Sequence, residues 1–576
     1  MAQTAATAKL TPAEEKEVEQ VPKSRQAQVR NYLEHMTPTE RVINQGFQDM
    51  QKLPRSEPQR ISAWPAFVTS HTLFINAGND GPANIAFGIR DFIKANRSKS
   101  LLLAARIQPI DAAFPPSSDL GKSLFESMTA ASLLKNDTAL GYALQLAQGS
   151  VALLHEDQYI SWQREDHAQR QRAAAGDPLN VPEAFSLADA TDSYHQQRAS
   201  RYATLGAIQA KLGDSTAAEK SFTRSLSFHP DMSAYLGMAQ IEEARGDKLA
   251  ALPWLYKADL TGRLDHANIL KMRAIYAATH SGSGRAQLAA LLDQQYEAGF
   301  HNPIQPTPYQ GDARRTLLAE LFTGAGCVPC MSPDLAFDAS LKRYHRQQLV
   351  LLVYHDNAPD LDPLSNWVTD QRDVYYGTQG STPHVMLDGS EIGIIQGPPT
   401  HALAAYGALT RKIDSDLKSP AGAQLSVHAT RQGSKVRVTV RGAIAKKLSP
   451  LVLHVDLLQT EVSDSGENGL RIQPMVVRAT ARRARKGSGF DVSGKTRFQQ
   501  TYTFDLNKIQ QANYSYYAYT VAQIEKRVHG LFQVSYREFS YKINPDKLAV
   551  AAFIQNNVNK RVLQAAYAPV AGASSN

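Results

Sequence analysis

Cysteine is almost absent from this chain, since its 576 residues include only Cys327 and Cys330. These two stand three positions apart. Because the chain has no other cysteine, no structural disulfide can lie outside the pair. Long apolar runs are absent as well. A stretch such as residues 100–105 is far too short to cross a bilayer, and no transmembrane segment is predicted. Hydrophobic residues still make up 43% of the chain, enough to fill the cores of about three to five domains.

The signatures of several other chemistries are missing too. A zinc site usually needs a second cysteine pair or closely spaced histidines, but His345, His355 and His384 fall on different predicted elements, so no metal is predicted. The segment Gly324-Ala-Gly326 is not followed by Lys-Ser/Thr, which excludes a phosphate-binding loop. Neither His-Glu-X-X-His nor a nucleophile elbow occurs. No bound cofactor is therefore predicted.

Positive charge is concentrated towards the C-terminus. The formal net charge is +8, and residues 421–576 contain 22 Lys and Arg against nine Asp and Glu, which leaves −5 for the rest. A basic surface can meet an anionic partner such as nucleic acid. A solvated sheet surface explains the same charge, and we predict no nucleic-acid partner.

The first part of the chain has a helical pattern. Residues 1–60 are polar and charged, with one helix predicted near residues 25–34. Residues 61–190 carry apolar side chains at three- and four-residue spacing, which predicts a helical domain. Within it, residues 166–189 are polar and predict a long loop or an exposed helix.

Residues 191–305 contain an internal repeat. Gly213 and Gly246 are 33 residues apart, and each begins a Gly-Asp turn before a second helical pattern. The repeat resembles tetratricopeptide repeats, in which stacked helix pairs bury their faces against one another. The resemblance implies a helical array whose concave surface binds a protein or peptide. A structural spacer explains the repeat equally well, so both interpretations stay open.

Residues 306–418 alternate strand and helix patterns, which predicts an α/β domain. The run at residues 348–354 is typical of a strand buried on both faces, and the apolar run before Cys327 predicts a further strand. The predicted elements are a strand at 317–322, a helix at 330–346, a strand at 348–354, a helix at 366–376, a hairpin with an Asp-Gly turn at 384–395 and a closing helix at 401–417.

Residues 419–576 change to a period of two, and short strands with turn signals predict an antiparallel β-sandwich. The alternating tyrosines of Tyr514–Tyr519 are predicted to fill its core. The predicted strands are 425–429, 435–440, 451–457, 502–504, 514–521 and 531–535, with a final hairpin of 547–554 and 561–566. The predicted fold is thus multidomain: a helical repeat array, an α/β domain and an all-β sandwich.

The cysteine pair lies where a predicted strand gives way to a predicted helix. A thiol attacks only as its thiolate, and the free N–H groups of a helix N-terminus lower the pKa of a cysteine placed there. We therefore predict that Cys327 is the exposed nucleophile. Cys330, one turn further along, is predicted to be more buried and to resolve a mixed disulfide formed at Cys327. Pro329 stiffens the turn between them.

About fifty residues later, Thr382-Pro383 precedes the predicted hairpin. Together with the strand, the Cys-Val-Pro-Cys motif and the helix, it gives residues 306–418 a resemblance to thioredoxin-fold domains of exported thiol-disulfide oxidoreductases. The resemblance implies a cis bond before Pro383 and a substrate strand bound at Thr382 and Pro383. It also implies that Glu320 is the buried proton shuttle, although its spacing from Cys327 is one residue longer than usual. Gly326 stands where thioredoxin proper has tryptophan.

Two functions follow as hypotheses. In the first, the chain is a thiol-disulfide oxidoreductase that acts on a protein client and exchanges electrons with a redox partner protein. The redox direction stays open. In the second, the chain is a non-catalytic interaction scaffold, and the cysteine pair is a structural or vestigial disulfide. The small-residue N-terminus is expected to be a mature end left after export to a compartment such as the periplasm, with a cytoplasmic location as the alternative.

Overall fold

The structure is a computed structural model of the chain, and it divides into two compact units. The first comprises residues 1–178 and 182–258, and the second residues 179–181 and 259–576. The residues described are 9–20, 23–34, 36–54, 57–76, 80–174, 184–280, 284–357, 361–378, 382–393, 396–444, 448, 450–481, 483–484, 487–528 and 541–572.

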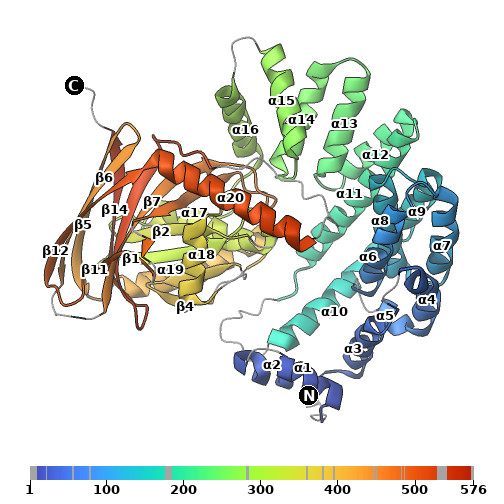
Figure 1. Cartoon of the computed structure of the whole chain (residues 1–576), viewed down its shortest axis with the longest axis horizontal. Coiled ribbons are helices and arrows are strands. Elements are labelled where there is room, and N and C mark those ends of the chain that lie inside the picture. The colour runs from blue at the N-terminus through green and yellow to red at the C-terminus, as the bar shows by residue number, and fades with distance from the viewer. Residues whose placement is uncertain are drawn as a thin grey trace. The chain divides into compact units, whose positions relative to one another are not determined.

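The first unit is helical throughout its described residues, as predicted (Figure 1). The helix predicted near residues 25–34 is α2, but α1 and α3 also form where none was predicted. Residues 166–174 belong to α10, and 175–183 lie outside the described residues. The helices are α1 (Pro12–Gln20), α2 (Lys23–Glu34), α3 (Pro38–Gln51), α4 (Glu57–Ser70), α5 (Thr72–Asn76), α6 (Asp80–Ala95), α7 (Ser100–Ala112), α8 (Asp119–Lys135), α9 (Leu140–Ala152), α10 (Glu156–Ala174), α11 (Leu187–Lys211), α12 (Ser215–Leu226), α13 (Met232–Ala244) and α14 (Lys248–Leu260), whose last two residues fall in the second unit.

The turns of the internal repeat explain its helix–turn–helix geometry. Gly213 and Gly246 adopt φ of +87° and +85°, a left-handed conformation that glycine adopts without strain and that ends the preceding helix. The aspartate that follows each glycine then caps the next helix. Asp214 accepts a hydrogen bond from the Ala217 N–H at 2.9 Å, and Asp247 accepts one from Ala250 N–H at 2.8 Å.

The second unit combines helices with a large mixed sheet and a small two-stranded sheet formed by β9 and β10. Its helices are α15 (His266–Thr279), α16 (Arg285–Gly299), α17 (Met331–Arg343), α18 (Trp367–Tyr376), α19 (Ala402–Asp416) and α20 (Leu506–Val528), with 3₁₀ turns η1 (Val328–Cys330) and η2 (Pro399–His401). Its strands are β1 (Leu317–Thr323), β2 (Leu349–His355), β3 (His384–Leu387), β4 (Ser390–Ile392), β5 (Ala423–Gln432), β6 (Lys435–Ile444), β7 (Leu451–Ser463), β8 (Ile472–Thr480), β9 (Arg483–Ala484), β10 (Gly487–Ser488), β11 (Phe490–Asp491), β12 (Arg497–Asp505), β13 (Leu548–Asn556) and β14 (Val562–Gly572).

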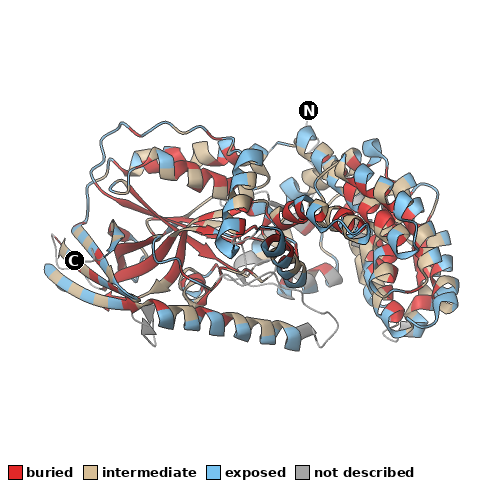
Figure 2. Ribbon diagram, turned by 90° about the horizontal axis from the view of Figure 1, so that it is seen from above, coloured by how far each residue is buried: buried red, intermediate tan, exposed pale blue. Residues whose placement is uncertain are grey.

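The strand and helix order predicted for residues 306–418 is confirmed element by element. Strand β1 pairs with β2 in parallel and with β3 antiparallel, and β3 and β4 form the predicted Asp-Gly hairpin. Both β1 and β2 are buried along their whole length, and the central strands are red in Figure 2. Alternate residues of β1 face opposite sides of the sheet. Thr323 contacts α17 on one side, and Glu320 contacts α18 on the other.

The predicted C-terminal strands continue this sheet instead of forming a separate one. Strand β8 pairs with β2, so twelve strands are joined in the order β12-β6-β5-β14-β13-β7-β8-β2-β1-β3-β4, with β11 beside β7. The β2–β8 and β14–β5 pairs are parallel, so the prediction of a purely antiparallel arrangement is wrong. Buried valines of β6 share a core with leucines of β7, which shows that the outer strands fold over the sheet. The predicted domain boundaries stay predictions, because the sheet runs across residue 418.

The predicted strand at residues 514–521 is wrong, because these residues lie in α20. The buried side chains of this helix are spaced at three and four residues: Leu506, Asn513 and Tyr516 are buried and Ile509 is half-buried. That spacing is a helical period, which the run of tyrosines disguised. Tyr516 donates a hydrogen bond to Asp370 Oδ1 at 2.8 Å, whereas Tyr514 and Tyr519 are exposed. The strand predicted at 531–535 lies outside the described residues.

Candidate functional site

The cysteine motif lies between β1 and α17, as the sequence predicted. Cys327 and Cys330 are joined by a disulfide, with their Cα atoms 5.3 Å apart. Cys327 immediately precedes the 3₁₀ turn η1, which contains Pro329, and Cys330 is the N-cap of α17. Both sulfurs therefore lie at the N-terminal end of a helix, where unpaired N–H groups favour a thiolate.

The predicted exposure of Cys327 is wrong for this disulfide-bonded form. Cys327 is only 3% exposed and Cys330 is fully buried, while Val328 between them is 47% exposed. One cause of the burial is the Thr382-Pro383 segment, which lies against the motif. The Thr382 hydroxyl donates to Cys327 Sγ at 3.5 Å, and the Thr382–Pro383 bond is cis, as the resemblance implied.

A second segment holds the start of α17 from the other side. The Gly397 N–H donates to the Pro329 carbonyl at 2.7 Å, and the Gly397 carbonyl accepts from the Ser332 N–H at 3.1 Å. Gly397 has a φ of +133°, and a Cβ there would lie 2.4 Å from His401 Nδ1. Only glycine fits this position without strain. These two hydrogen bonds therefore fix the backbone where the cysteine motif ends and α17 begins.

Two carboxyl groups that the sequence analysis missed lie next to the motif: Asp334, which is half-buried, and Asp362, which is buried. Asp334 stands four residues after Cys330 on α17, so the two side chains share one helix face, with Cβ atoms about 5–6 Å apart. The Thr323 hydroxyl donates to Asp334 Oδ2 at 3.1 Å. Asp362 accepts from the Ala325 N–H at 2.5 Å and lies 3.0 Å from His355 Nδ1. The spacing of four from the second cysteine was the signal that could have found Asp334.

The protonation of Asp334 suits proton transfer. Burial raises its pKa to about 7, a shift that Asp362 reinforces and that Thr323 and His355 oppose. A carboxyl group with this pKa can both accept and donate a proton near neutral pH. A cavity of about 220 Å³ borders Asp334, and Asp338 and Lys342, further along α17, line it as well. Asp334 thus stands four residues after Cys330 and lies on the wall of a cavity whose lining is mostly apolar.

Glu320, the residue predicted to be the proton shuttle, lies on the other face of the sheet. It is fully buried, and its two oxygens accept from Arg372 Nε at 2.6 Å and Arg372 Nη2 at 2.9 Å. The Tyr376 hydroxyl also donates to Glu320 Oε2 at 2.6 Å. Burial lowers the pKa of the Arg372 guanidinium. Glu320 and the neighbouring tyrosines outweigh burial and raise the pKa of Arg372 well above its ordinary value. These contacts give Glu320 the partners of a structural ion pair, and its proton-shuttle role remains an untested prediction.

The three histidines considered for zinc do not gather. His355 lies against Asp362, and His384 Nδ1 lies 2.5 Å from Glu391 Oε1. Within the described ranges, no three side chains of His, Cys, Asp or Glu are grouped so that they could hold a metal ion. In the same ranges, no helix combines the length and apolarity that a membrane span needs.

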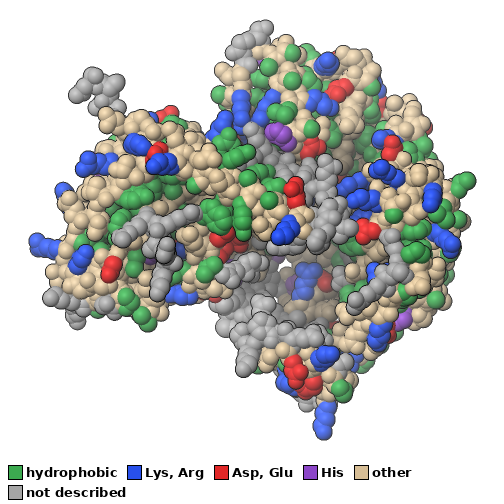
Figure 3. Space-filling view, in the orientation of Figure 1, with side chains coloured by type: hydrophobic (Ala, Val, Ile, Leu, Met, Phe, Trp, Pro, Cys, Tyr) green, Lys and Arg blue, Asp and Glu red, His purple; other side chains and the backbone are tan. Residues whose placement is uncertain are grey.

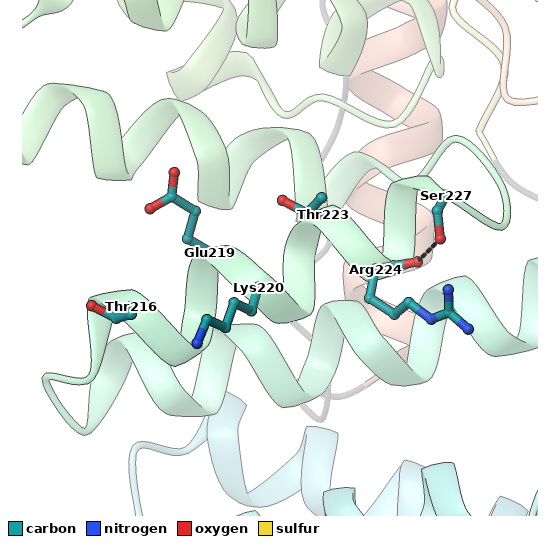
Figure 4. Close-up of a pocket in the computed structure, with 6 residues that line it drawn as sticks. All are labelled: Thr216, Glu219, Lys220, Thr223, Arg224 and Ser227. Carbon is teal, nitrogen blue, oxygen red and sulfur yellow. Dashed lines mark hydrogen bonds between the residues drawn. The ribbon is translucent and has the colours of Figure 1, made fainter.

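The helical repeat carries a surface groove of about 510 Å³. Its lining side chains come from α12 and from the residue that caps its C-terminus (Figure 4), namely Thr216, Glu219, Lys220, Thr223, Arg224 and Ser227. Glu219 is paired with Arg245 of the next helix at 2.5 Å. The groove is polar and of mixed charge, and the predicted protein ligand on the repeat stays a prediction.

The positively charged side chains of the C-terminal strands are spread over the surface. On the face drawn in Figure 3, Lys and Arg over β5, β6 and β12 stand apart among uncharged groups. Lys435 is paired with Asp505 at 2.5 Å, and Arg431 with Asp546 at 3.1 Å. This arrangement is typical of a solvated sheet surface.

Comparison with known proteins adds little to this geometry. No protein-family model matches the chain, and no curated protein matches it. Among solved structures, HBP35 of Porphyromonas gingivalis is similar over 46% of this chain and 79% of that one, with 14% identity and a TM-score of 0.32. A likeness of this size carries no argument, so the function rests on the site itself.

Proposed function

We propose that residues 306–418 form a thioredoxin-fold domain and that the chain catalyses thiol-disulfide exchange through Cys327 and Cys330. The observation that carries the proposal is the convergence of three groups on one disulfide. Thr382 donates to Cys327 Sγ, the sulfurs lie at the start of α17, and Asp334 follows Cys330 on the same helix face. The order β1-α17-β2-α18-β3-β4-α19 supports the fold assignment.

In the reducing direction, the Cys327 thiolate attacks one sulfur of a client disulfide. A Cys327–client bond forms, and the other client sulfur leaves as a thiolate. The Asp334 carboxylate takes the proton of the Cys330 thiol, and the Cys330 thiolate attacks Cys327 Sγ. The internal disulfide forms and the second client thiolate leaves, so two electrons pass to the client. A dithiol of a redox partner protein reduces the Cys327–Cys330 disulfide and becomes a disulfide itself, which restores the Cys327–Cys330 dithiol, and the reverse sequence oxidises a client.

Replacing Cys327 with serine tests this function. The full chain is mixed with a disulfide-bonded protein probe and dithiothreitol, and separately with a reduced probe and oxidised glutathione. We expect the wild-type chain to turn over the probe in one or both directions. Cys327→Ser should be no faster than dithiothreitol or oxidised glutathione alone, because a serine hydroxyl does not replace the thiolate as nucleophile. Equal rates for the two proteins would support the scaffold hypothesis instead.

Asp334 gives the exchange reaction a pH signature. When dithiothreitol attacks Cys327 Sγ, Cys330 leaves and takes a proton from Asp334, which is protonated below its pKa of about 7. The reduction rate, corrected for the thiolate fraction of dithiothreitol, should therefore fall as pH rises through about 7. In Asp334→Asn this step should vanish, and the corrected rate at pH 6 should fall about a hundredfold, since a positioned acid contributes that much or more. An unchanged step in Asp334→Asn would contradict the role.

The parts of the chain outside residues 306–418 are proposed to determine which client protein binds. The repeat helices α11 to α14 resemble tetratricopeptide units, and their turn geometry supports that resemblance. The proposed partners are a protein client and a redox partner protein, in an exported compartment where such exchange is useful.

A further inference from the structure

The loop between β7 and β8 reaches the cysteine motif from far along the chain. It spans residues 464–471, more than 130 positions after Cys330. Its conformation is fixed from within: the Gly466 N–H donates to the Leu470 carbonyl at 2.8 Å, and the Leu470 N–H donates to Asn468 Oδ1 at 3.1 Å. These contacts give one residue of the loop, Asn468, a defined position.

Asn468 touches the motif at two points. Its backbone N–H donates to the Ala325 carbonyl at 2.8 Å, two residues before Cys327. Its side-chain Nδ2 donates to Asp334 Oδ2 at 3.3 Å, the same oxygen that accepts from Thr323. Asn468 is almost fully buried. One residue therefore contacts both the loop that carries Cys327 and the carboxyl group next to Cys330.

The loop also packs closely against the neighbouring backbone. A Cβ on Gly466 would lie 2.8 Å from the Ala325 carbonyl oxygen, and a Cβ on Gly262 would lie 2.1 Å from the Gly466 backbone. Both positions have room for hydrogen only. At the end of the loop, buried Arg471 donates to Asp293 Oδ1 at 2.7 Å and to Ser465 Oγ at 2.8 Å. A loop packed this tightly can hold Asn468 in one geometry.

We propose that Asn468 is a positioning residue of the redox centre, which fixes the Asp334 carboxyl group and the Cys327 loop together. The C-terminal strands are then part of the exchange site and not an appended module. This inference rests on the proposed function, because it assigns Asn468 a role in that same exchange. Its physical basis is that an amide donor stabilises the ionised form of a buried carboxyl group, and removing it favours the protonated form.

The test is the pH profile of reduction of the chain's own disulfide by dithiothreitol. In Asn468→Ala, the step that wild type shows near pH 7 should move up by about one pH unit, because a hydrogen bond to a charged group is worth at least that much. In Asn468→Asp, which keeps the side-chain size, the second carboxylate should move the step at least as far. Circular dichroism identifies the variants that fold, and either one suffices.

The matched control is Asn366→Ala. Asn366 is also a buried asparagine, and its Nδ2 donates to the Val477 carbonyl of β8 at 2.9 Å without touching Asp334. In Asn366→Ala, the step in the reduction rate should stay near pH 7. A step that stays in place in folded Asn468 variants, or that moves equally in Asn366→Ala, would overturn the inference. The assay needs no client, so a chain that fails to turn over a client can still show the Asn468 effect.

Discussion

Replacing Cys330 with serine is expected to stop multiple turnover and to leave the client covalently bound at Cys327. The nucleophile and its thiolate-stabilising helix N-terminus remain, so the first attack still occurs. The resolving sulfur is gone, so the mixed disulfide has no internal route to break. Steady-state exchange should fall to the rate of the small thiol alone, and about one client molecule per chain should accumulate. Non-reducing electrophoresis and mass spectrometry detect this adduct.

The control is Cys327→Ser, in which only Cys330 remains. Cys330 is the more deeply buried of the two, fully buried against 3% exposed for Cys327, so this variant should form less adduct under the same conditions. The double variant, with both cysteines replaced, gives the background. If both single variants trapped client equally, Cys327 would not be the attacking residue. If neither did, the pair would be a structural disulfide, and the scaffold hypothesis would stand.

Much of the redox region was predictable because its elements have simple patterns. Two largely apolar runs predicted β1 and β2, and the cysteine pair between a strand and a helix located the motif. The Thr382-Pro383 position followed from the resemblance, and the structure brings its hydroxyl to Cys327 Sγ. The role of the acid stays a prediction. The resemblance implied Glu320, which strand alternation turns towards α18, whereas helix periodicity places Asp334 on the same helix face as Cys330.

The rest of the sheet was harder to predict because it depends on long-range pairing. Period-two patterns identified β5, β6, β7 and β13 correctly, but they carry no information about neighbours. The β2–β8 pair joins residues more than 120 positions apart, and no local signal marks it. The contacts of Asn468 are hidden for the same reason. Helix α20 was missed because aromatic residues favour strands in general, and here its packing against α18 outweighs that preference.

Among the variants proposed, breaking the buried Glu320–Arg372 ion pair under α18 should lower the free energy of unfolding most. Replacing Arg372 with alanine leaves the fully buried Glu320 carboxylate without its cation and removes the donor to Gln555 Oε1, now 2.9 Å away. Removing one partner of a buried pair costs about 3–5 kcal/mol of the free energy of unfolding. Urea unfolding followed by fluorescence measures this loss in a background where Trp64, Trp162 and Trp254 are replaced by phenylalanine, because Trp367 is then the sole tryptophan.

Two further variants separate the ion pair from simple packing. In the double variant Glu320→Leu with Arg372→Met, both charges are replaced by apolar groups of similar size, so most of the lost stability should return. The exposed pair Lys412–Asp416 on α19 provides the surface control, and Lys412→Ala should change the free energy of unfolding by about 0.5 kcal/mol or less. A double variant as unstable as Arg372→Ala would mean that the Arg372 contacts with Tyr376 and Gln555, and not the charge pair, stabilise this face of the sheet. In all of these variants the exchange step near pH 7 should stay in place, because Asp334 lies on the opposite face.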